Sequence, residues 1–358
     1  MTCPDRLAIQ HEVTLALARW QSQWLPRSCV NRLTGVGQRK SVIMSPSDSL
    51  SSPVDVSGFA YVVGVDIGSQ SAVYCVCQPD KRQVVKPTEL ANSRAGFEAL
   101  EGSLRQLGVA PARILIGLEA TGRYSENLYQ FFQEQGYPLC LLHPRQTHQF
   151  SKQRGLRAKT DRLDASTIAR LLLSGEARAG YVPDELISTY RELERLHSQL
   201  AGDSARYQNE IQALLVVLFP EFGQVFADPC RPTALALLKR YPSAKAVLAA
   251  GVDALTTTLR ELAPRHYGRK TAERLVRLAR QSAASGQASA ARTLSLKVLC
   301  DQLEHTQVNL ALVEQELDQL LQRDVGAKGL KSTPEFGRKT VAVLRAELGD
   351  VTRFQRVD

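Results

Sequence analysis

Short apolar runs alternate with amphipathic stretches between residues 59 and 182. The apolar runs are rich in β-branched residues and predict buried strands over 61–67, 72–77, 83–86, 113–118 and 138–142. Apolar residues at helical spacing predict helices over 94–107, 123–135 and 160–174. Three sequential strands followed by alternating helices and strands predict an α/β domain with a mixed sheet.

After residue 183 the strand pattern stops and long helical patterns begin. Residues 188–219 read as one helix, with an apolar face of Leu193, Leu196, Leu200, Tyr207, Ile211, Leu214 and Leu218. Residues 228–286 read as several shorter helices separated by Pro and Gly. Residues 293–323 carry a seven-residue repeat, with Leu296, Leu303, Leu310 and Leu317 at one position and Leu299, Thr306, Val313 and Leu320 at the next.

Such a repeat is typical of a coiled coil, either between chains or within one. Within one chain, 188–219 would pack against 293–323 as a helical hairpin, and the two interpretations are compatible. Further along, Pro334 and Gly337 form a Pro-x-x-Gly turn that leads into another helical pattern. This turn has the outline of a helix-hairpin-helix element, although it contains only one Gly.

The first residues differ from the rest of the chain in charge and polarity. Residues 1–43 carry six basic and two acidic residues, and a polar stretch follows Met44. Either Met44 is the true start or the segment is a disordered basic arm, and no apolar core of a signal peptide is present. We expect a disordered extension over 1–58, an α/β domain over 59–182, an all-α region over 183–328 and a partial further domain over 329–358.

Charge and cysteine content narrow the class of protein. The 358 residues include 45 Lys and Arg against 36 Asp and Glu, a net charge of +9 that favours an anionic partner. The apolar runs are shorter than the ~20 residues that a membrane span requires, so we expect no membrane association. Seven scattered Cys without a CxxC pair argue against a disulfide framework or a zinc site and fit a cytoplasmic protein.

Four carboxylates lie where predicted elements begin or end. Asp66 lies at the end of the first strand, and Glu119 directly follows the fourth. Asp161 and Asp164 are three residues apart, so a helix places both on one face. Together they would repel one another unless a cation neutralised them, and Mg²⁺ prefers oxygen ligands. Two such ions ~3.5–4 Å apart could clamp the attacking and leaving oxygens of a phosphodiester. Each acid alone also fits a turn, a surface position or a helix N-terminus.

Two basic stretches are candidate nucleic-acid contacts. A predicted loop leads into the Asp-x-x-Asp pair and carries Arg145, Lys152, Arg154, Arg157 and Lys159. A predicted helix within 260–280 places Lys270, Arg274 and Arg277 on one face and leaves Leu275, Val276 and Ala279 for a core. Both stretches could equally be solvated surfaces. Tyr124 and Tyr267 lie near basic residues and could stack on bases.

Several motifs resemble the insertion-sequence transposases with a RuvC-like DEDD domain, the insertion-sequence family numbered one hundred and ten. The resembling stretches are Val-Gly-Val-Asp66-Ile-Gly, Gly-Leu-Glu119-Ala-Thr-Gly-Arg-Tyr, His143-Pro-Arg-Gln146 and Ala-Lys-Thr-Asp161-Arg-Leu-Asp164-Ala. Near the end, Ala-Glu-Leu-Gly-Asp-Val-Thr-Arg-Phe354 resembles the start of the family's second domain. The resemblance runs from about Phe59 to the last residue.

The resemblance implies a ribonuclease H-like domain whose four acids, Asp66, Glu119, Asp161 and Asp164, bind Mg²⁺. It also implies DNA as substrate, a guide RNA from the element, a coiled coil that mediates oligomerisation, and a C-terminal transposase domain with a nucleophilic serine.

Two departures from the family pattern stand out. The family's turn usually reads Pro-Gly-x-Gly, whereas this chain has Pro334-Glu-Phe-Gly337. The family's serine segment should follow Phe354, but the sequence ends at Asp358. No serine here can be carried over as the nucleophile, so we expect this chain to be incomplete, to bind nucleic acid and not to complete transposition.

Three other functions compete with a transposase. A Mg²⁺-dependent junction-resolving nuclease needs only the four acids, with water as nucleophile. A non-catalytic remnant would bind nucleic acid without cleaving it. Actin-like ATPases also open with an Asp-x-Gly hairpin, but they need a second such hairpin and a Gly-rich adenosine motif, and neither is found in this sequence.

Overall fold

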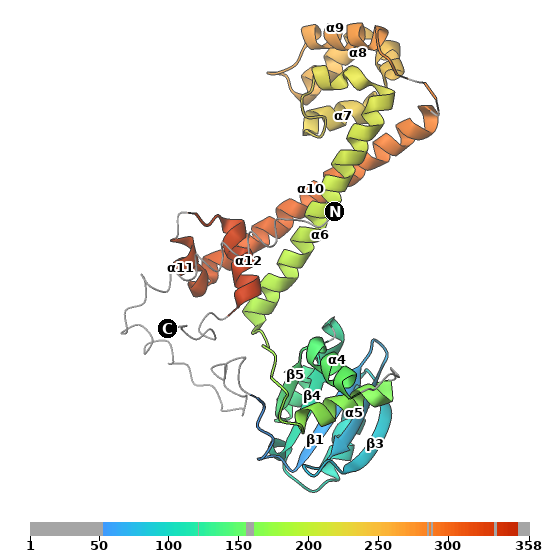
Figure 1. Cartoon of the computed structure of the whole chain (residues 1–358). Helices are drawn as coiled ribbons and strands as arrows, with labels where there is room; N and C mark the ends of the chain where they lie inside the picture. Colours follow the sequence, from blue (N-terminus) through green and yellow to red (C-terminus); the bar gives the residue numbers. More distant parts are fainter. Residues whose placement is uncertain are drawn as a thin grey trace. The chain divides into compact units, whose positions relative to one another are not determined.

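The computed structural model describes residues 53–120, 122–154, 161–284, 286–287, 289–332 and 335–349, without the side chains of 161–163. The chain divides into two compact units, residues 1–181 and 182–358. Figure 1 shows an α/β arrangement in the first and helices alone in the second. Of the extension predicted to be disordered, residues 1–58, residues 1–52 lie outside the described part of the chain.

The first unit is built on a five-stranded mixed sheet. Its strands are β1 (Tyr61–Ile67), β2 (Ser71–Cys77), β3 (Gln83–Ala91), β4 (Ile114–Glu119) and β5 (Leu139–Leu142). The order across the sheet is β3-β2-β1-β4-β5, with β1, β2 and β3 antiparallel and β1, β4 and β5 parallel. This confirms the predicted mixed sheet. Strand β3 runs five residues past its predicted end, because its edge position leaves most side chains exposed and without an apolar pattern.

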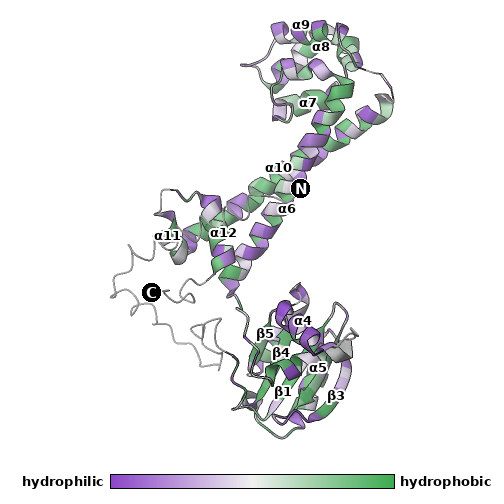
Figure 2. Ribbon diagram, in the orientation of Figure 1, coloured by the Kyte–Doolittle hydropathy of each residue, from purple (hydrophilic) through white to green (hydrophobic). Residues whose placement is uncertain are grey.

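Both faces of the central strands are buried because helices cover each side. Alternate residues of a strand point to opposite faces. Val63 and Val65 of β1 pack with α2 (Arg94–Arg105) and α3 (Glu126–Glu134) in one core. Val62 packs on the other face with residues of α4 (Pro144–Gln153) and α5 (Asp161–Leu172). Figure 2 shows the apolar colouring of these strands. Two 3₁₀ turns, Pro111–Arg113 and Gly122–Ser125, precede β4 and α3.

Two glycines let α5 lie directly on the sheet. A Cβ atom on Gly64 of β1 would lie 2.2 Å from the Ala165 carbonyl oxygen and 2.6 Å from the Ala169 nitrogen. A Cβ atom on Gly117 of β4 would lie 2.3 Å from a methyl carbon of Leu172. Because the contacts at Gly64 are to backbone atoms, a side chain there is not tolerated and the backbone of α5 lies against β1, whereas the Leu172 side chain of α5 occupies the space over Gly117.

The second unit is organised around two long helices, α6 (Glu185–Leu218) and α10 (Ser289–Arg323). They lie side by side and run in opposite directions (Figure 1), which matches the predicted hairpin. Between them in sequence lie a 3₁₀ turn (Pro220–Gln224), α7 (Pro232–Arg240), α8 (Ala244–Leu262) and α9 (Arg269–Arg280). These elements share one core with the adjoining ends of α6 and α10, which includes Phe222, Leu235, Leu275 and Leu303.

The buried face of α6 differs from the predicted leucine face. Leu196 is 44% exposed, whereas Glu194, His197 and Ser204 are buried. The reason is that the first half of α6 packs against α12 (Arg338–Leu348) as well as α10, which shifts its buried stripe onto polar residues. His197 Nε2 lies 3.2 Å from Glu314 Oε1 on α10.

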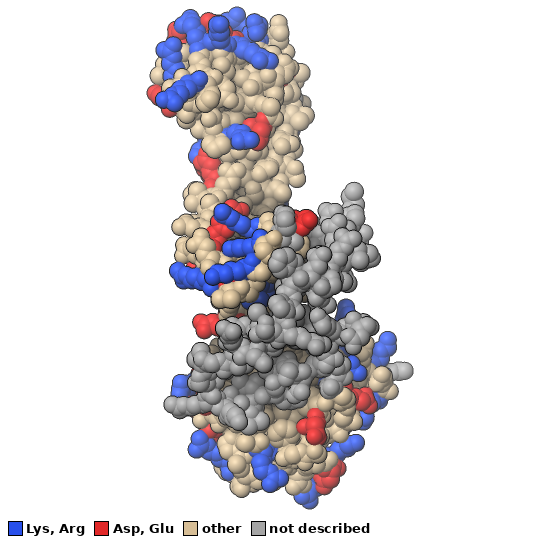
Figure 3. All heavy atoms as spheres, turned by 90° about the vertical axis from the view of Figure 1, so that its left-hand side faces the viewer, with Lys and Arg blue, Asp and Glu red and all other residues tan. Residues whose placement is uncertain are grey.

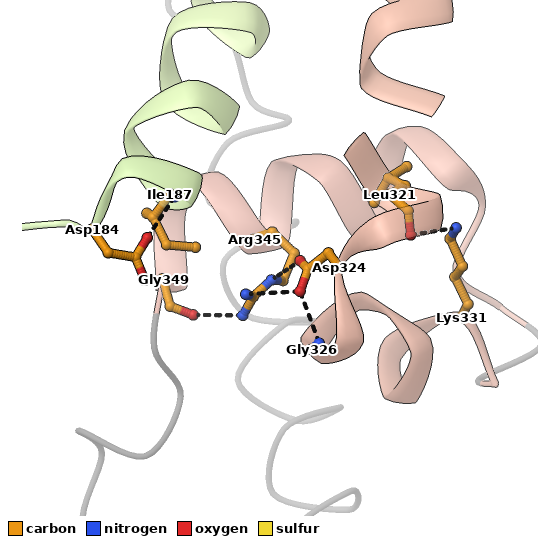
Figure 4. A network of polar contacts seen from close by, with 8 residues as sticks. All are labelled: Asp184, Ile187, Leu321, Asp324, Gly326, Lys331, Arg345 and Gly349. Atoms are coloured by element: carbon orange, nitrogen blue, oxygen red, sulfur yellow. Dashed lines mark hydrogen bonds and ion pairs between the residues drawn. The ribbon is translucent and has the colours of Figure 1, made fainter. Parts of the chain in front are cut away.

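A buried ion pair joins the end of α10 to α11 (Val325–Lys331) and α12. Arg345 Nε donates to Asp324 Oδ2 at 2.6 Å, and its Nη1 donates to the Gly349 carbonyl at 3.0 Å (Figure 4). Asp324 also accepts from the Gly326 nitrogen at 2.8 Å, so it caps α11. The two side chains are only 3% and 11% exposed, and loss of either would leave a buried unpaired charge. Pro334, the first residue of the predicted hairpin turn, lies outside the described residues.

Two further expectations concern the described part of the chain. None of its helices is both long enough and apolar enough to cross a bilayer. The five cysteines of the described residues are free and buried, namely Cys75, Cys77, Cys140, Cys230 and Cys300.

Candidate functional site

Two of the predicted acids lie side by side at one edge of the sheet. In the parallel register of β1 and β4, Val65 pairs with Leu118, so the next residues in line are Asp66 and Glu119. Asp66 lies two residues after Gly64, and Glu119 lies two residues after Gly117. Both glycines face α5, and residues two apart on a strand share a face, so both acids lie on the α5 face of the sheet. Both are half-buried.

The helix that carries the other two acids begins at the same edge. Asp164 is half-buried, and the next residue, Ala165, is the one whose carbonyl approaches Gly64. Asp161 is the first residue of α5, and its side chain is not described. Two strand ends and one helix start therefore meet where the sequence predicted a cluster. Among the described side chains, no three His, Cys, Asp or Glu lie close enough to hold a metal ion.

Glu119 is held in place by a threonine that the sequence analysis did not single out. The Thr147 hydroxyl on α4 donates to Glu119 Oε2 at 2.5 Å. The Thr147 hydroxyl oxygen also lies 2.9 Å from the Pro144 carbonyl oxygen. The hydroxyl has one proton, and the carboxylate is the stronger acceptor. Thr147 directly follows the His143-Pro-Arg-Gln146 motif, which was the available signal for it.

Helix α4 replaces much of the predicted basic loop, which corrects that prediction. Only Thr147 and Phe150 of α4 are buried, so the segment lacks the apolar periodicity that reveals a helix. His143 caps the helix by accepting from the Arg145 nitrogen at 3.1 Å. The Gln146 side chain makes two 2.9 Å hydrogen bonds to the backbone of Arg178 and so ties α4 to the chain after α5.

The cationic residues of this segment are exposed where they are described. Arg145, Lys152 and Arg154 point to solvent, and the Arg154 guanidinium lies 4.3 Å from the centre of the Phe150 ring. Arg157 and Lys159 lie outside the described residues.

Helix α9 carries the second predicted basic surface. Its exposed face includes Lys270, Arg274 and Arg277, and it buries Leu275, Val276 and Ala279 together with Ala272. The predicted division of this helix into a charged and a core face is therefore confirmed.

The two candidate stacking tyrosines differ in exposure. Tyr124 is 52% exposed, whereas the Tyr267 ring packs against Phe226 at a centroid distance of 5.2 Å. Tyr267 is half-buried against the core of the helical unit, so Tyr124 is the more accessible of the two candidates.

The donor set at the sheet edge suits a hard divalent cation. Its members Asp66, Glu119, Asp161 and Asp164 are all carboxylates, and Mg²⁺ prefers oxygen ligands and tolerates few protein carboxylates per ion. Asp66 and Glu119 are adjacent on parallel strands, so the chemistry of the donor set suits such an ion, although no three described side chains are gathered closely enough to hold it.

Comparisons with known proteins point to transposases. Residues 63–220 match the family described as DEDD transposase of the IS110 type. A protein of Streptomyces coelicolor, named insertion element IS110 uncharacterized 43.6 kDa protein, is 29% identical over 202 residues, 55% of this chain and 49% of its own length. The chain thus spans about half the length of that relative.

Two solved structures of Thermus thermophilus RuvC cover 34% of this chain and 99% of their own. The one in complex with Holliday junction substrate gives a TM-score of 0.25 at 15% identity, and the other 0.24 at 14%. Scores this low carry no argument about function. The family match extends from β1 through the end of α6 and includes all four predicted acids. Both the family match and the relative thus relate this chain by similarity to IS110-type transposases, and the similarity to the family covers residues 63–220.

Proposed function

We propose that this chain is a transposase that cuts and joins DNA strands at a Mg²⁺ site formed by Asp66, Glu119, Asp161 and Asp164. The observation that carries the proposal is the meeting of β1, β4 and the start of α5 at one edge of the sheet. The family and relative matches support the same reaction class.

The chain's own groups have distinct tasks in this site. Asp66 and Glu119 are on adjacent strands, and the Thr147 hydroxyl orients Glu119. Bound Mg²⁺ would supply charge stabilisation to a phosphodiester during strand cleavage and transfer. Arg145, Lys152 and Arg154 are on or directly after α4, which contacts α5, and they would attract the DNA backbone together with Arg157 and Lys159.

A guide RNA and a homo-oligomer belong to the same proposal. The predicted heptad leucines Leu296, Leu303 and Leu317 are buried within the chain, so they are unavailable to a second copy. A different stripe on α10 is exposed, with side chains 49–64% accessible at Leu294, Val298, Val308 and Leu312. Their spacings of four, ten and four residues place them on one helix face at heptad positions, which suits pairing with a second copy. We place the protein in the cytoplasm, where its DNA lies.

Metal-dependent stability and DNA cleavage test the site together. Mg²⁺ should raise the melting temperature of the chain and support nicking of a supercoiled plasmid. Asp66→Asn should be more stable than wild type without metal, because it relieves repulsion among the acids. It should lose both the gain on adding Mg²⁺ and the nicking.

The matched control is Glu89→Gln, which removes an exposed carboxylate from strand β3 of the same sheet. It should behave like wild type in both measurements. Equal Mg²⁺ stabilisation of wild type and Asp66→Asn would refute the metal site. Strand transfer as opposed to simple nicking distinguishes a transposase from a junction-resolving nuclease.

A further inference from the structure

An excess of positive charge that is not neutralised within the chain lies at α8 and α9 in the second unit. Residues 260–280 contain seven Lys and Arg against two Glu. Arg269 pairs with Asp253 at 2.9 Å and with Glu273 at 3.0 Å, and Glu261 pairs with Arg240. Within the described residues, the six others make no ion pair, namely Arg260, Arg265, Lys270, Arg274, Arg277 and Arg280.

Helix α9 presents several of these charges on a firmly packed element. Its opposite face is part of the same core as Phe226 and Leu235, so the helix is fixed in place. Lys270, Arg274 and Arg277 are all exposed along it. Figure 3 shows Lys and Arg gathered over the end of the unit that carries α8 and α9.

The spacing of these charges suits a nucleic-acid backbone. Seven residues of helix span about 10 Å at a rise of ~1.5 Å per residue. Double-stranded DNA carries one charge per about 1.7 Å of its axis, so a surface of this length meets several phosphates. Backbone contacts of this kind fix position without reading base sequence.

The same surface lacks the groups that bind unpaired bases. Proteins that bind single strands stack bases on exposed aromatic side chains. Among the described residues of 219–287, no Phe, Tyr or Trp side chain is exposed, since Phe219, Phe222 and Phe226 are buried and Tyr241 and Tyr267 are half-buried against the core. This favours a paired helix, in which the bases are stacked internally, over a single strand.

We infer that α9 is a docking surface for the phosphate backbone of double-stranded DNA. The inference rests on the proposed function in taking nucleic acid as the partner, but it uses neither the four acids nor the α/β unit. It assigns the helical unit the task of holding a DNA duplex, and preference for an RNA duplex is an outcome that the test distinguishes.

Fluorescence anisotropy with the full chain in EDTA tests this without cleavage. The probes are a 20-base-pair DNA duplex, an RNA duplex of the same sequence and their separate strands. The variant is the triple substitution Lys270→Gln, Arg274→Gln and Arg277→Gln. It should bind the DNA duplex about tenfold or more weakly and lower the slope of log affinity against log salt by about 2–3, since each phosphate contact contributes about 0.9.

A matched triple variant separates location from net charge. Lys245→Gln, Lys297→Gln and Lys328→Gln remove three exposed charges from α8, α10 and α11 that make no ion pair within the described residues. This control should keep wild-type affinity and salt slope. Equal losses in the two triples, an unchanged slope in the α9 triple, or a loss confined to the RNA duplex or to single strands would overturn the inference. Because EDTA removes divalent ions from this assay, failure of the metal site in the Mg²⁺ tests is read separately from failure of this inference.

Discussion

A single hydroxyl holds one of the candidate metal ligands. Thr147→Val keeps the shape of this buried side chain but removes the donor to Glu119. Loss of such an orienting partner typically costs about 10–100-fold in metal affinity or activity. We expect that loss in Mg²⁺ binding measured by calorimetry.

Rescue separates orientation from packing at this position. Thr147→Ser retains the hydroxyl and should recover most of the affinity, although it removes a methyl group. Thr189→Val, which removes a hydroxyl from the exposed side of α6, should have no effect on Mg²⁺ binding. If Thr147→Val bound Mg²⁺ as tightly as wild type, Thr147 would have no role in placing Glu119.

Gly64 tests whether α5 must lie against the sheet. Gly64→Ala would bring a methyl group to 2.2 Å from the Ala165 carbonyl, so the helix backbone has to move. Overpacking of this kind costs about 1–3 kcal/mol, and we expect the upper end because backbone atoms are involved. Calorimetric unfolding should show the loss. Gly102→Ala, in α2 with no atom near the new methyl group, should instead stabilise by up to about 1 kcal/mol.

At the scale of helices, the buried carboxyl of α6 makes stability depend on pH. Burial raises the pKa of Glu194 above its usual value of 4.5, while nearby His197 and Lys339 oppose the rise. Neither carboxylate oxygen has a hydrogen-bond partner within the described residues. The folded state therefore binds a proton at Glu194 more tightly than the unfolded state does. The ionised carboxylate lowers the free energy of unfolding at neutral pH, and this destabilisation decreases as the pH falls from the raised pKa toward 4.5.

Glu194→Gln should therefore be more stable than wild type at neutral pH, and the difference should shrink as the pH falls through that window. Chemical denaturation at several pH values measures it. Glu210→Gln, which alters an exposed carboxyl on the same helix, should leave the pH dependence unchanged. A variant less stable than wild type at pH 7 would mean that the charge is compensated.

The helices and strands differ in how well the local sequence predicted them. The strands β1, β2, β4 and β5 consist mainly of apolar residues, so their boundaries were predicted within one residue. Helix α4 has two buried residues, and its capping by His143 and Pro144 was the only local sign of it. The buried face of α6 depends on α12, more than a hundred residues away, and no local pattern contains that information.

The candidate site was predictable for the same reason as the strands. Asp66 and Glu119 end strands whose pairing follows from the α/β order, and Asp164 lies on a helix with a clear apolar face. Thr147 was missed because it reaches Glu119 from an element that the pattern did not reveal.

For the whole molecule, the exposed stripe of α10 leads to a prediction about self-association. Leu294→Lys with Leu312→Lys should convert an oligomer to a monomer and leave the melting temperature of the helical unit nearly unchanged, since both side chains already face solvent. Leu303→Lys should instead unfold that unit, because Leu303 is fully buried. Light scattering together with calorimetry distinguishes the two. A monomeric wild-type chain would contradict the stripe's assigned role.

The most direct test of the whole account is to locate a divalent ion by anomalous diffraction from crystals soaked in Mn²⁺. We predict density for at least one ion among the carboxylates of Asp66, Glu119, Asp161 and Asp164, and its loss in Asp66→Asn crystals of the same form. Saturating Mn²⁺ that leaves this edge of the sheet empty, or that binds there equally in Asp66→Asn, would contradict the assignment of these acids as the metal site.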